Sequence, residues 1–223
     1  MKLFRNFSEP SHQFTVFRIM VKYKENPTLL QRIENLHPYE TMLYLGMLGS
    51  GLIFLFMASA FLFSSRALLA GMNQNVPIAF LISTFLLVIS GFSATSIRLA
   101  YQEENTNRLL GSLGTTVILG MIFTILQVVG WYELKAKGIE FTGIPSGSFL
   151  YVLSGIHIFH LLGAMIFGLI LYFQLAKSRK DEVQKLIIHT NPFEKMRVRL
   201  FTFYWHFMDG IWLILFLLFV LSF

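Results

Sequence analysis

Five apolar stretches, each long enough to cross a lipid bilayer, restrict the folds open to this chain more than any other feature. A membrane-spanning helix needs about 20 mostly apolar residues. Backbone polar groups inside hydrocarbon must be bonded internally, and apolar stretches of this length satisfy that condition as helices. We therefore predict an all-α membrane protein with five transmembrane helices. The predicted spans cover about 41–65, 77–97, 109–132, 148–176 and 200–223.

Charged residues are scarce and lie almost entirely outside these spans. Asp, Glu, Lys and Arg make up 13% of the chain, against about 25% in a typical soluble domain. Asp209 is the one formally charged residue within the predicted spans. Cysteine is absent, which excludes disulfides and thiolate metal sites. The composition therefore indicates a membrane protein rather than a large soluble core.

The distribution of Lys and Arg predicts the orientation. If all five segments span, residues 1–40, 98–108 and 177–199 lie on one side, and they hold fifteen of the eighteen Lys and Arg residues. Because basic residues are enriched in cytoplasmic loops, we expect the N-terminus in the cytoplasm and the C-terminus outside. The net charge of +6 then belongs to loops beside anionic lipid, and no nucleic-acid partner is expected.

The chain divides, in this interpretation, into a cytoplasmic arm (1–40) and a five-helix transmembrane domain (41–223). The arm has an amphipathic stripe over residues 29–36, which is typical of a helix lying at the membrane interface. Asn191, Pro192 and Glu194 form a helix-start pattern of N-cap, first-turn proline and acid at the third position. They predict that the last helix begins near Pro192, before its apolar stretch.

Four polar side chains inside the spans are the main candidates for function. His157 and His160 lie in the fourth span, and His206 and Asp209 lie in the fifth. Members of each pair are three residues apart, so each pair shares a helix face. Ionisable groups in hydrocarbon are costly and usually face a partner. The helix rise of about 1.5 Å per residue puts His157 near the level of Asp209, and His160 near that of His206. We hypothesise that these pairs join the fourth and fifth spans as antiparallel neighbours.

Three interpretations of this cluster remain open. The first is a buried hydrogen-bond network that fixes helix packing, because a carboxylate beside an imidazole lowers the burial cost of both. The second is a metal or haem site built from three His and one Asp. The third is a proton relay, because His titrates near neutral pH and Asp–His chains occur in pumps.

Two charged residues at the ends of spans are further candidates. Glu133 follows the third span on the outer side, where it is either an interfacial charge beside aromatic residues or an inward-pointing partner for the polar cluster. Arg98 ends the second span on the cytoplasmic side, where it is either a plain positive flank or a ligand for a lipid phosphate.

Three segments, Tyr151–His160, Tyr204–Trp212 and Asn107–Glu133, combine polar and aromatic residues in a distinctive order. Together they resemble subunit III of the haem–copper terminal oxidases (cytochrome c oxidase subunit 3). Tyr151–His160 resembles that family's "TGxHGxHV" segment, and Tyr204–Trp212 resembles its "YWHFVDxVW" segment, which also lies in the last helix. Asn107–Glu133 is similar to the family's "LxxxxxLGxxFxxxQxxEY" helix. The resemblance covers about residues 40–223, and five spans match the shorter bacterial form of the family.

The resemblance implies a subunit without redox centres in an oxidase complex of the bacterial inner membrane. Haem and copper would lie in partner subunits. This chain would pack directly beside subunit I, with subunit II and a small subunit as further partners. It would bind phospholipid and support proton uptake and sustained turnover, and the His and Asp residues of the two motifs would hold the helices together. No catalytic or metal-binding residue is expected in this chain.

One departure from the family concerns the first shared helix, which commonly carries an acidic residue after a serine. The aligned pair here is Ser59-Ala60, so a role for that carboxylate is absent. Two alternatives stay open: the accessory subunit of a quinol oxidase or nitric oxide reductase, and a free-standing transporter or membrane metalloenzyme that uses the same polar cluster.

Overall fold

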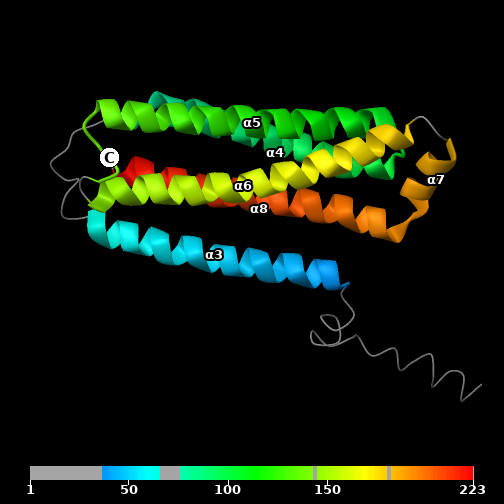
Figure 1. Cartoon of the computed structure of the whole chain (residues 1–223), viewed down its shortest axis with the longest axis horizontal. Helices are drawn as coiled ribbons and strands as arrows, with labels where there is room; N and C mark the ends of the chain where they lie inside the picture. The colour runs from blue at the N-terminus through cyan, green and yellow to red at the C-terminus, as the bar shows by residue number, and fades with distance from the viewer. Residues whose placement is uncertain (1–36, 66–75, 143–144, 180–181, 223) are drawn as a thin grey trace, which may run out of the picture. The chain divides into compact units, whose positions relative to one another are not determined.

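The structure, a computed structural model, describes residues 37–65, 76–142, 145–179 and 182–222, and within these ranges it contains helices and no strand (Figure 1). Its five long helices are α3 (Pro38–Ser65), α4 (Ile78–Gln102), α5 (Thr106–Ala136), α6 (Pro145–Ser178) and α8 (Pro192–Ser222). A short helix, α7 (Glu182–Thr190), precedes α8. All five long helices are long and apolar enough to cross a membrane. The predicted all-α class with five transmembrane helices is confirmed.

The chain divides into two units, Met1–Met42 and Leu43–Phe223, and the packing described below belongs to the second. The stripe over residues 29–36, which predicts an interfacial helix, lies outside the described residues. Described helices extend beyond the apolar stretches that predicted them. The additional turns of α5, α6 and α8 carry polar residues, which is expected because these turns lie beyond the apolar part of each helix.

Helix starts follow local sequence signals. The predicted start of the last helix is confirmed, because α8 begins at Pro192 and the Asn191 Oδ1 accepts a hydrogen bond from the Phe193 N–H at 2.9 Å. Glu194 lies in the first turn and forms an ion pair with Arg197 at 3.1 Å. Pro77 precedes α4 as its N-cap residue, with Ile78 the first helical residue.

Four of the long helices form a closed ring. α4 lies against α5 and α8, and α6 lies against the same two helices (Figure 1). Successive helices run in opposite directions, because α4 joins α5 through a three-residue turn and α6 returns through α7 to α8. The hypothesis that the fourth and fifth spans are antiparallel neighbours is therefore confirmed for α6 and α8.

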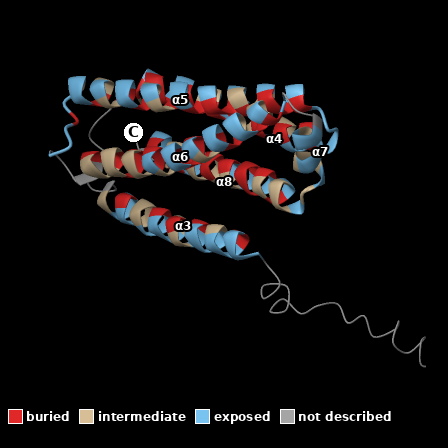
Figure 2. Cartoon of the chain, turned by 45° about the vertical axis from the view of Figure 1, so that its right-hand side comes forward, coloured by how far each residue is buried: buried red, intermediate tan, exposed pale blue. Residues whose placement is uncertain are grey.

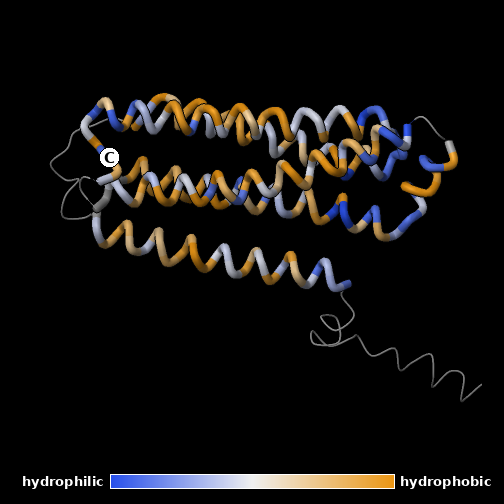
Figure 3. The backbone as a smooth tube through the Cα atoms, viewed as in Figure 1, coloured by the Kyte–Doolittle hydropathy of each residue, from blue (hydrophilic) through white to orange (hydrophobic). Residues whose placement is uncertain are grey.

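Large aromatic and aliphatic side chains are buried in the core. Exposed residues lie along the outward faces of the helices, and many of them are hydrophobic (Figures 2 and 3). Trp205 and Trp212 of α8 are fully buried. Gly120 of α5 provides room for one of them, because a Cβ atom at this position would lie 2.8 Å from the Trp205 Cη2. Hydrophilic residues gather at the end of the bundle that carries α7 (Figure 3).

Candidate functional site

His157 of α6 is a fully buried imidazole surrounded by aromatic rings. Its ring centroid lies 5.1 Å from that of Trp212, 5.7 Å from that of Phe123 and 6.2 Å from that of Phe54. Neither ring nitrogen has a hydrogen-bond partner among the described residues. Such a group is unusual, since buried polar atoms in proteins are nearly always bonded. His157 therefore packs as one member of a cluster of aromatic rings.

His160 lies one turn further along α6 and bonds within its own helix. Its Nδ1 is 2.9 Å from the Ile156 carbonyl oxygen, and its ring centroid lies 5.6 Å from that of Phe54. The backbone oxygen of His160 accepts a hydrogen bond from the Tyr204 hydroxyl of α8 at 3.4 Å. The α6 pair therefore contacts α3 and α8 mainly through rings and backbone.

His206 and Asp209 of α8 face α4. The His206 Nε2 lies 3.2 Å from the Thr95 hydroxyl oxygen. The Asp209 side chain lies over Gly91, where an added Cβ atom would come within 2.8 Å of its Oδ2. The His206 Nδ1 is 3.8 Å from the same oxygen, which is too long for a hydrogen bond. Neither Asp209 oxygen is bonded to any group in the described part of the chain.

These two residues line an open groove between α4 and α8, which we name the α4–α8 groove. Its volume is about 330 Å³, and the His206 side chain is 41% exposed in it, against 11% for Asp209. Apart from Thr95, its other walls are apolar or glycine residues. They are Leu87, Val88, Gly91, Phe92, Gly210 and Leu213.

The two pairs, which the sequence predicts to be joined, are not linked to each other by a hydrogen bond in the described part of the chain. His157 and Asp209 share no hydrogen bond within the described residues, although their helices are neighbours. The reason is the rotation of α8 about its own axis. Trp205 and Trp212 occupy the inward face, which places Asp209 at the edge toward α4 and His206 further out.

Hydrogen bonds from other side chains connect the helices instead. The indole N–H of Trp205 donates to Ser90 Oγ at 3.1 Å, and that of Trp212 donates to Thr84 Oγ1 at 2.9 Å. The Gln127 amide of α5 donates to Ser83 Oγ at 2.7 Å. All three acceptors belong to α4. Sequence reasoning did not identify this set, although the seven-residue spacing of Ser83 and Ser90 places them on one helix face.

Glu133 of α5 caps a neighbouring helix. One carboxylate oxygen accepts a hydrogen bond from the Ile78 N–H at 2.9 Å, and the other accepts one from the Ala79 N–H at 3.3 Å. The first N–H groups of a helix have no partner within it, and the N-terminus carries partial positive charge. Glu133 therefore points toward α4 and not toward the polar residues of α6 and α8.

Replacing Glu133 by alanine should loosen the first turn of α4. Loss of a capping carboxylate costs about 1 kcal/mol, so the amides of Ile78 and Ala79 should exchange with solvent about fivefold faster. Hydrogen exchange followed by mass spectrometry measures this directly. Glu140→Ala is the matched control, because Glu140 lies in the loop after α5 and its carboxylate accepts no hydrogen bond from a helix N–H within the described residues. Equal exchange in both variants would contradict the capping role.

Arg98 lies near the α7 end of the bundle in a basic pocket. The pocket has a volume of about 260 Å³ and lies between α4 and α8, where Lys195 and Arg199 also line it. Tyr101 adds a hydroxyl, which donates to the Ile188 carbonyl oxygen at 2.7 Å. Three cations around one pocket favour a ligand with a phosphate group.

Within the described ranges, no three His, Asp or Glu side chains converge as a metal site would require. His157 faces aromatic rings, whereas His206 and Asp209 face α4. The metal and haem interpretation therefore gains no support from the arrangement of the four candidate residues.

A family model described as "Cytochrome c oxidase subunit III" matches residues 69–222, which include α4 to α8. The chain is 31% identical over 135 residues to a Rickettsia prowazekii protein named "Probable cytochrome c oxidase subunit 3", covering 60% of this chain and 45% of that protein. It is 33% identical over 135 residues to the protein of the same name from Rickettsia bellii, with the same coverage.

Animal proteins show a similar likeness. The chain is 30% identical over 139 residues to "Cytochrome c oxidase subunit 3" of Spodoptera frugiperda, which covers 61% of this chain and 84% of that protein. The chain spans about half the length of the Rickettsia proteins it matches. The model match leaves α3, and with it the Ser59-Ala60 pair, outside the matched residues.

Proposed function

The chain belongs to the cytochrome c oxidase subunit III family, and from this premise we propose that it is a subunit of a proton-pumping haem–copper oxidase that itself carries no redox centre. The complex would reduce dioxygen to water, with haem and copper in companion chains. This chain would pack directly against the haem-carrying subunit I and stabilise it, with subunit II and a small subunit as further partners.

The α4–α8 groove is the observation that carries this proposal. Its ionisable residues lie midway along helices that are long enough to cross a bilayer, yet His206 is 41% exposed and Asp209 has no bonded oxygen in the described residues. Ionisable groups facing lipid cost several kcal/mol, so such groups usually face protein or a water-filled cavity. A helix of a neighbouring chain that brings a hydrogen-bond partner into the groove would satisfy the exposed His206, while Asp209 lies beside it with both oxygens covered by this chain.

The other candidate residues act within the chain in this proposal. His157 and His160 hold α6 against the rings of α3, α5 and α8, and Glu133 holds the start of α4. We propose a location in the bacterial inner membrane with the α7 end in the cytoplasm, because most described Lys and Arg residues lie at that end. The N-terminus would then be cytoplasmic and the C-terminus outside.

The basic pocket around Arg98 supports binding of an anionic phospholipid at the cytoplasmic surface. Lys195 and Arg199 extend from the first turns of α8, on the proposed cytoplasmic side. Guanidinium groups bind phosphate oxygens through paired hydrogen bonds, and each basic residue near an anionic surface contributes about 1 kcal/mol.

Site-specific cross-linking tests the partner. A photoreactive amino acid at Leu213, which lines the α4–α8 groove, should form a covalent adduct with the haem-carrying chain in native membranes. The same amino acid at Phe159 is the control, because Phe159 is exposed on α6 away from the groove. Adducts with lipid alone from Leu213, in membranes where the complex is assembled, would contradict the proposal.

A further inference from the structure

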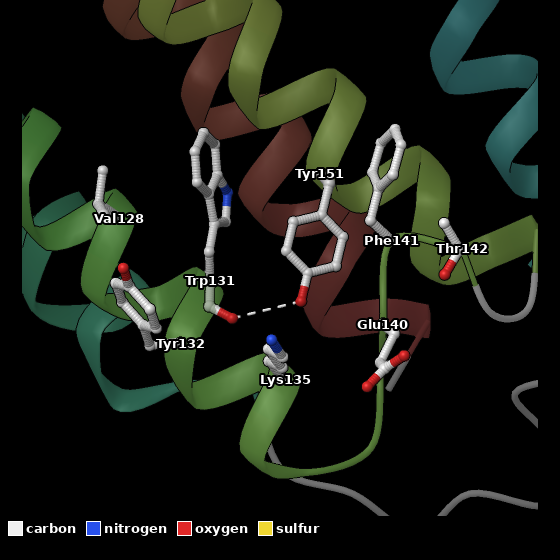
Figure 4. A pocket seen from close by; sticks show the side chains of 8 residues that line it. All are labelled: Val128, Trp131, Tyr132, Lys135, Glu140, Phe141, Thr142 and Tyr151. Atoms are coloured by element: carbon white, nitrogen blue, oxygen red, sulfur yellow. Dashed lines mark hydrogen bonds between the residues drawn. The ribbon is translucent and has the colours of Figure 1, made fainter.

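A pocket at the end of the bundle opposite α7 combines aromatic walls with one positive and one negative side chain (Figure 4). It has a volume of about 520 Å³, within the range of small-molecule sites. It lies between the last turns of α5, the loop after α5 and the first turns of α6. The residues lining it are Val128, Trp131, Tyr132, Lys135, Glu140, Phe141, Thr142 and Tyr151.

Hydrogen bonds hold the frame of this pocket in place. The Tyr151 hydroxyl of α6 is 2.7 Å from the Ile139 carbonyl oxygen and 3.2 Å from the Trp131 carbonyl oxygen (Figure 4). The Trp131 indole N–H donates to Ser154 Oγ at 2.9 Å. These contacts tie α5, the loop and α6 together, so the pocket exists before any ligand enters.

The loop itself is fixed by a Schellman motif at the end of α5. Gly138 has a φ of +79°, a conformation that glycine adopts without strain. Its N–H donates to the Lys135 carbonyl oxygen, and the Ile139 N–H donates to the Leu134 carbonyl oxygen. Ile139 and Leu134 are both buried. The motif thereby fixes Glu140 at one side of the pocket while Lys135 stands on α5.

The two charged side chains line the same pocket without neutralising each other. Lys135 and Glu140 are both exposed, and no ion pair joins them in the described part of the chain. Exposed Tyr132 and Phe141 stand beside them. Aromatic residues of this kind gather at the boundary between hydrocarbon and water. The pocket thus offers a cation and an anion at headgroup level and an apolar wall below them.

We propose that this pocket binds the headgroup of a zwitterionic phospholipid that carries a primary ammonium group. Lys135 would contact the phosphate, and Glu140 would accept hydrogen bonds from the ammonium group. Val128 and the aromatic rings would contact the glycerol and the first methylenes of the acyl chains. The site is separate from the α4–α8 groove and from the basic pocket around Arg98, and it requires only that α5 and α6 span a bilayer.

Native mass spectrometry of the full chain in mild detergent tests this site, with three lipids added in turn: phosphatidylethanolamine, phosphatidylcholine and phosphatidylglycerol. We expect the wild type to retain the ethanolamine lipid about three- to tenfold better than the choline lipid, whereas the anionic phosphatidylglycerol also has the basic pocket around Arg98 as a binding site. Glu140→Ala should remove this preference and leave phosphatidylglycerol binding unchanged. Lys135→Ala should weaken retention of phosphatidylethanolamine and phosphatidylcholine alike, because both carry the phosphate.

Lys195→Ala is the control for these two variants. It removes a cation from the other end of the bundle and should not change the ethanolamine preference. The Lys135 and Glu140 side chains are both exposed, so variants at these positions should fold as the wild type does. An unchanged lipid preference in Glu140→Ala, or equal retention of the ethanolamine and choline lipids by the wild type, would overturn the proposal.

Discussion

Trp205→Ala should destabilise the isolated chain by about 3–5 kcal/mol, the range for truncating a buried aromatic side chain. Trp205 is fully buried, packs 5.6 Å from the Phe201 ring centroid and fills the space left by Gly120. Its indole N–H also donates to Ser90, so alanine removes both a large packed volume and a hydrogen bond between α8 and α4. Helix association in lipid depends on packing and hydrogen bonds, and both are lost here. Unfolding of the purified chain in mixed micelles, followed by circular dichroism, measures the loss.

Two further variants separate these contributions. Trp205→Phe keeps a ring and loses the N–H donor, so its cost should be smaller, about 1–2 kcal/mol. Phe159→Ala removes a large aromatic side chain from an exposed position on α6 and should change stability by less than about 0.5 kcal/mol. A Trp205→Ala variant as stable as Phe159→Ala would show that the ring of four helices does not pack around this indole.

Asp209→Ala should weaken attachment of the chain to its complex by about 1–2 kcal/mol, or about five- to thirtyfold, without destabilising the chain itself. The carboxylate makes no hydrogen bond within the described residues, so its removal should not lower the stability of the isolated bundle. The exposed His206, whose Nδ1 lies 3.8 Å from the carboxylate, would lose the neighbouring charge that favours its contact with the companion chain. The ratio of this chain to companion chains after detergent washing measures the effect.

Two further substitutions act as controls for this result. Asp209→Asn retains an acceptor oxygen and should keep most of the attachment. Gly163→Ala changes a residue of α6 outside the groove, where an added Cβ meets nothing within 4 Å, and should leave attachment unchanged. If Asp209→Ala unfolds the isolated chain and leaves its attachment intact, the residue serves the bundle and the groove is not an interface.

The sequence predicts the helices well because their signals are local. Length and apolarity identify the five spans, and Asn191 with Pro192 identifies the start of α8 within a residue. Helix-face spacing also groups His206 with Asp209 correctly. Each of these inferences needs only residues within a few turns of one another along the chain.

The partners of the polar residues could not be predicted, because they depend on how each helix is rotated about its axis. Matching depth along the membrane places His157 level with Asp209, yet rotation of α8 directs Asp209 toward Gly91 of α4. The capping role of Glu133 likewise depends on where α4 begins relative to α5. The spacing of residues within one helix determines neither the rotation of that helix against its neighbours nor the level at which a neighbouring helix begins.

Cofactor analysis of the separated chain decides whether haem and copper lie only in the companion chains. The native complex should be purified through a tag on this chain in mild detergent and then dissociated, and haem, iron, copper and zinc should be measured in each separated polypeptide together with its optical spectrum. We expect haem and copper to accompany the companion chains, and we expect this chain to show no Soret band. Haem or a metal ion in one-to-one ratio with this chain alone would contradict it.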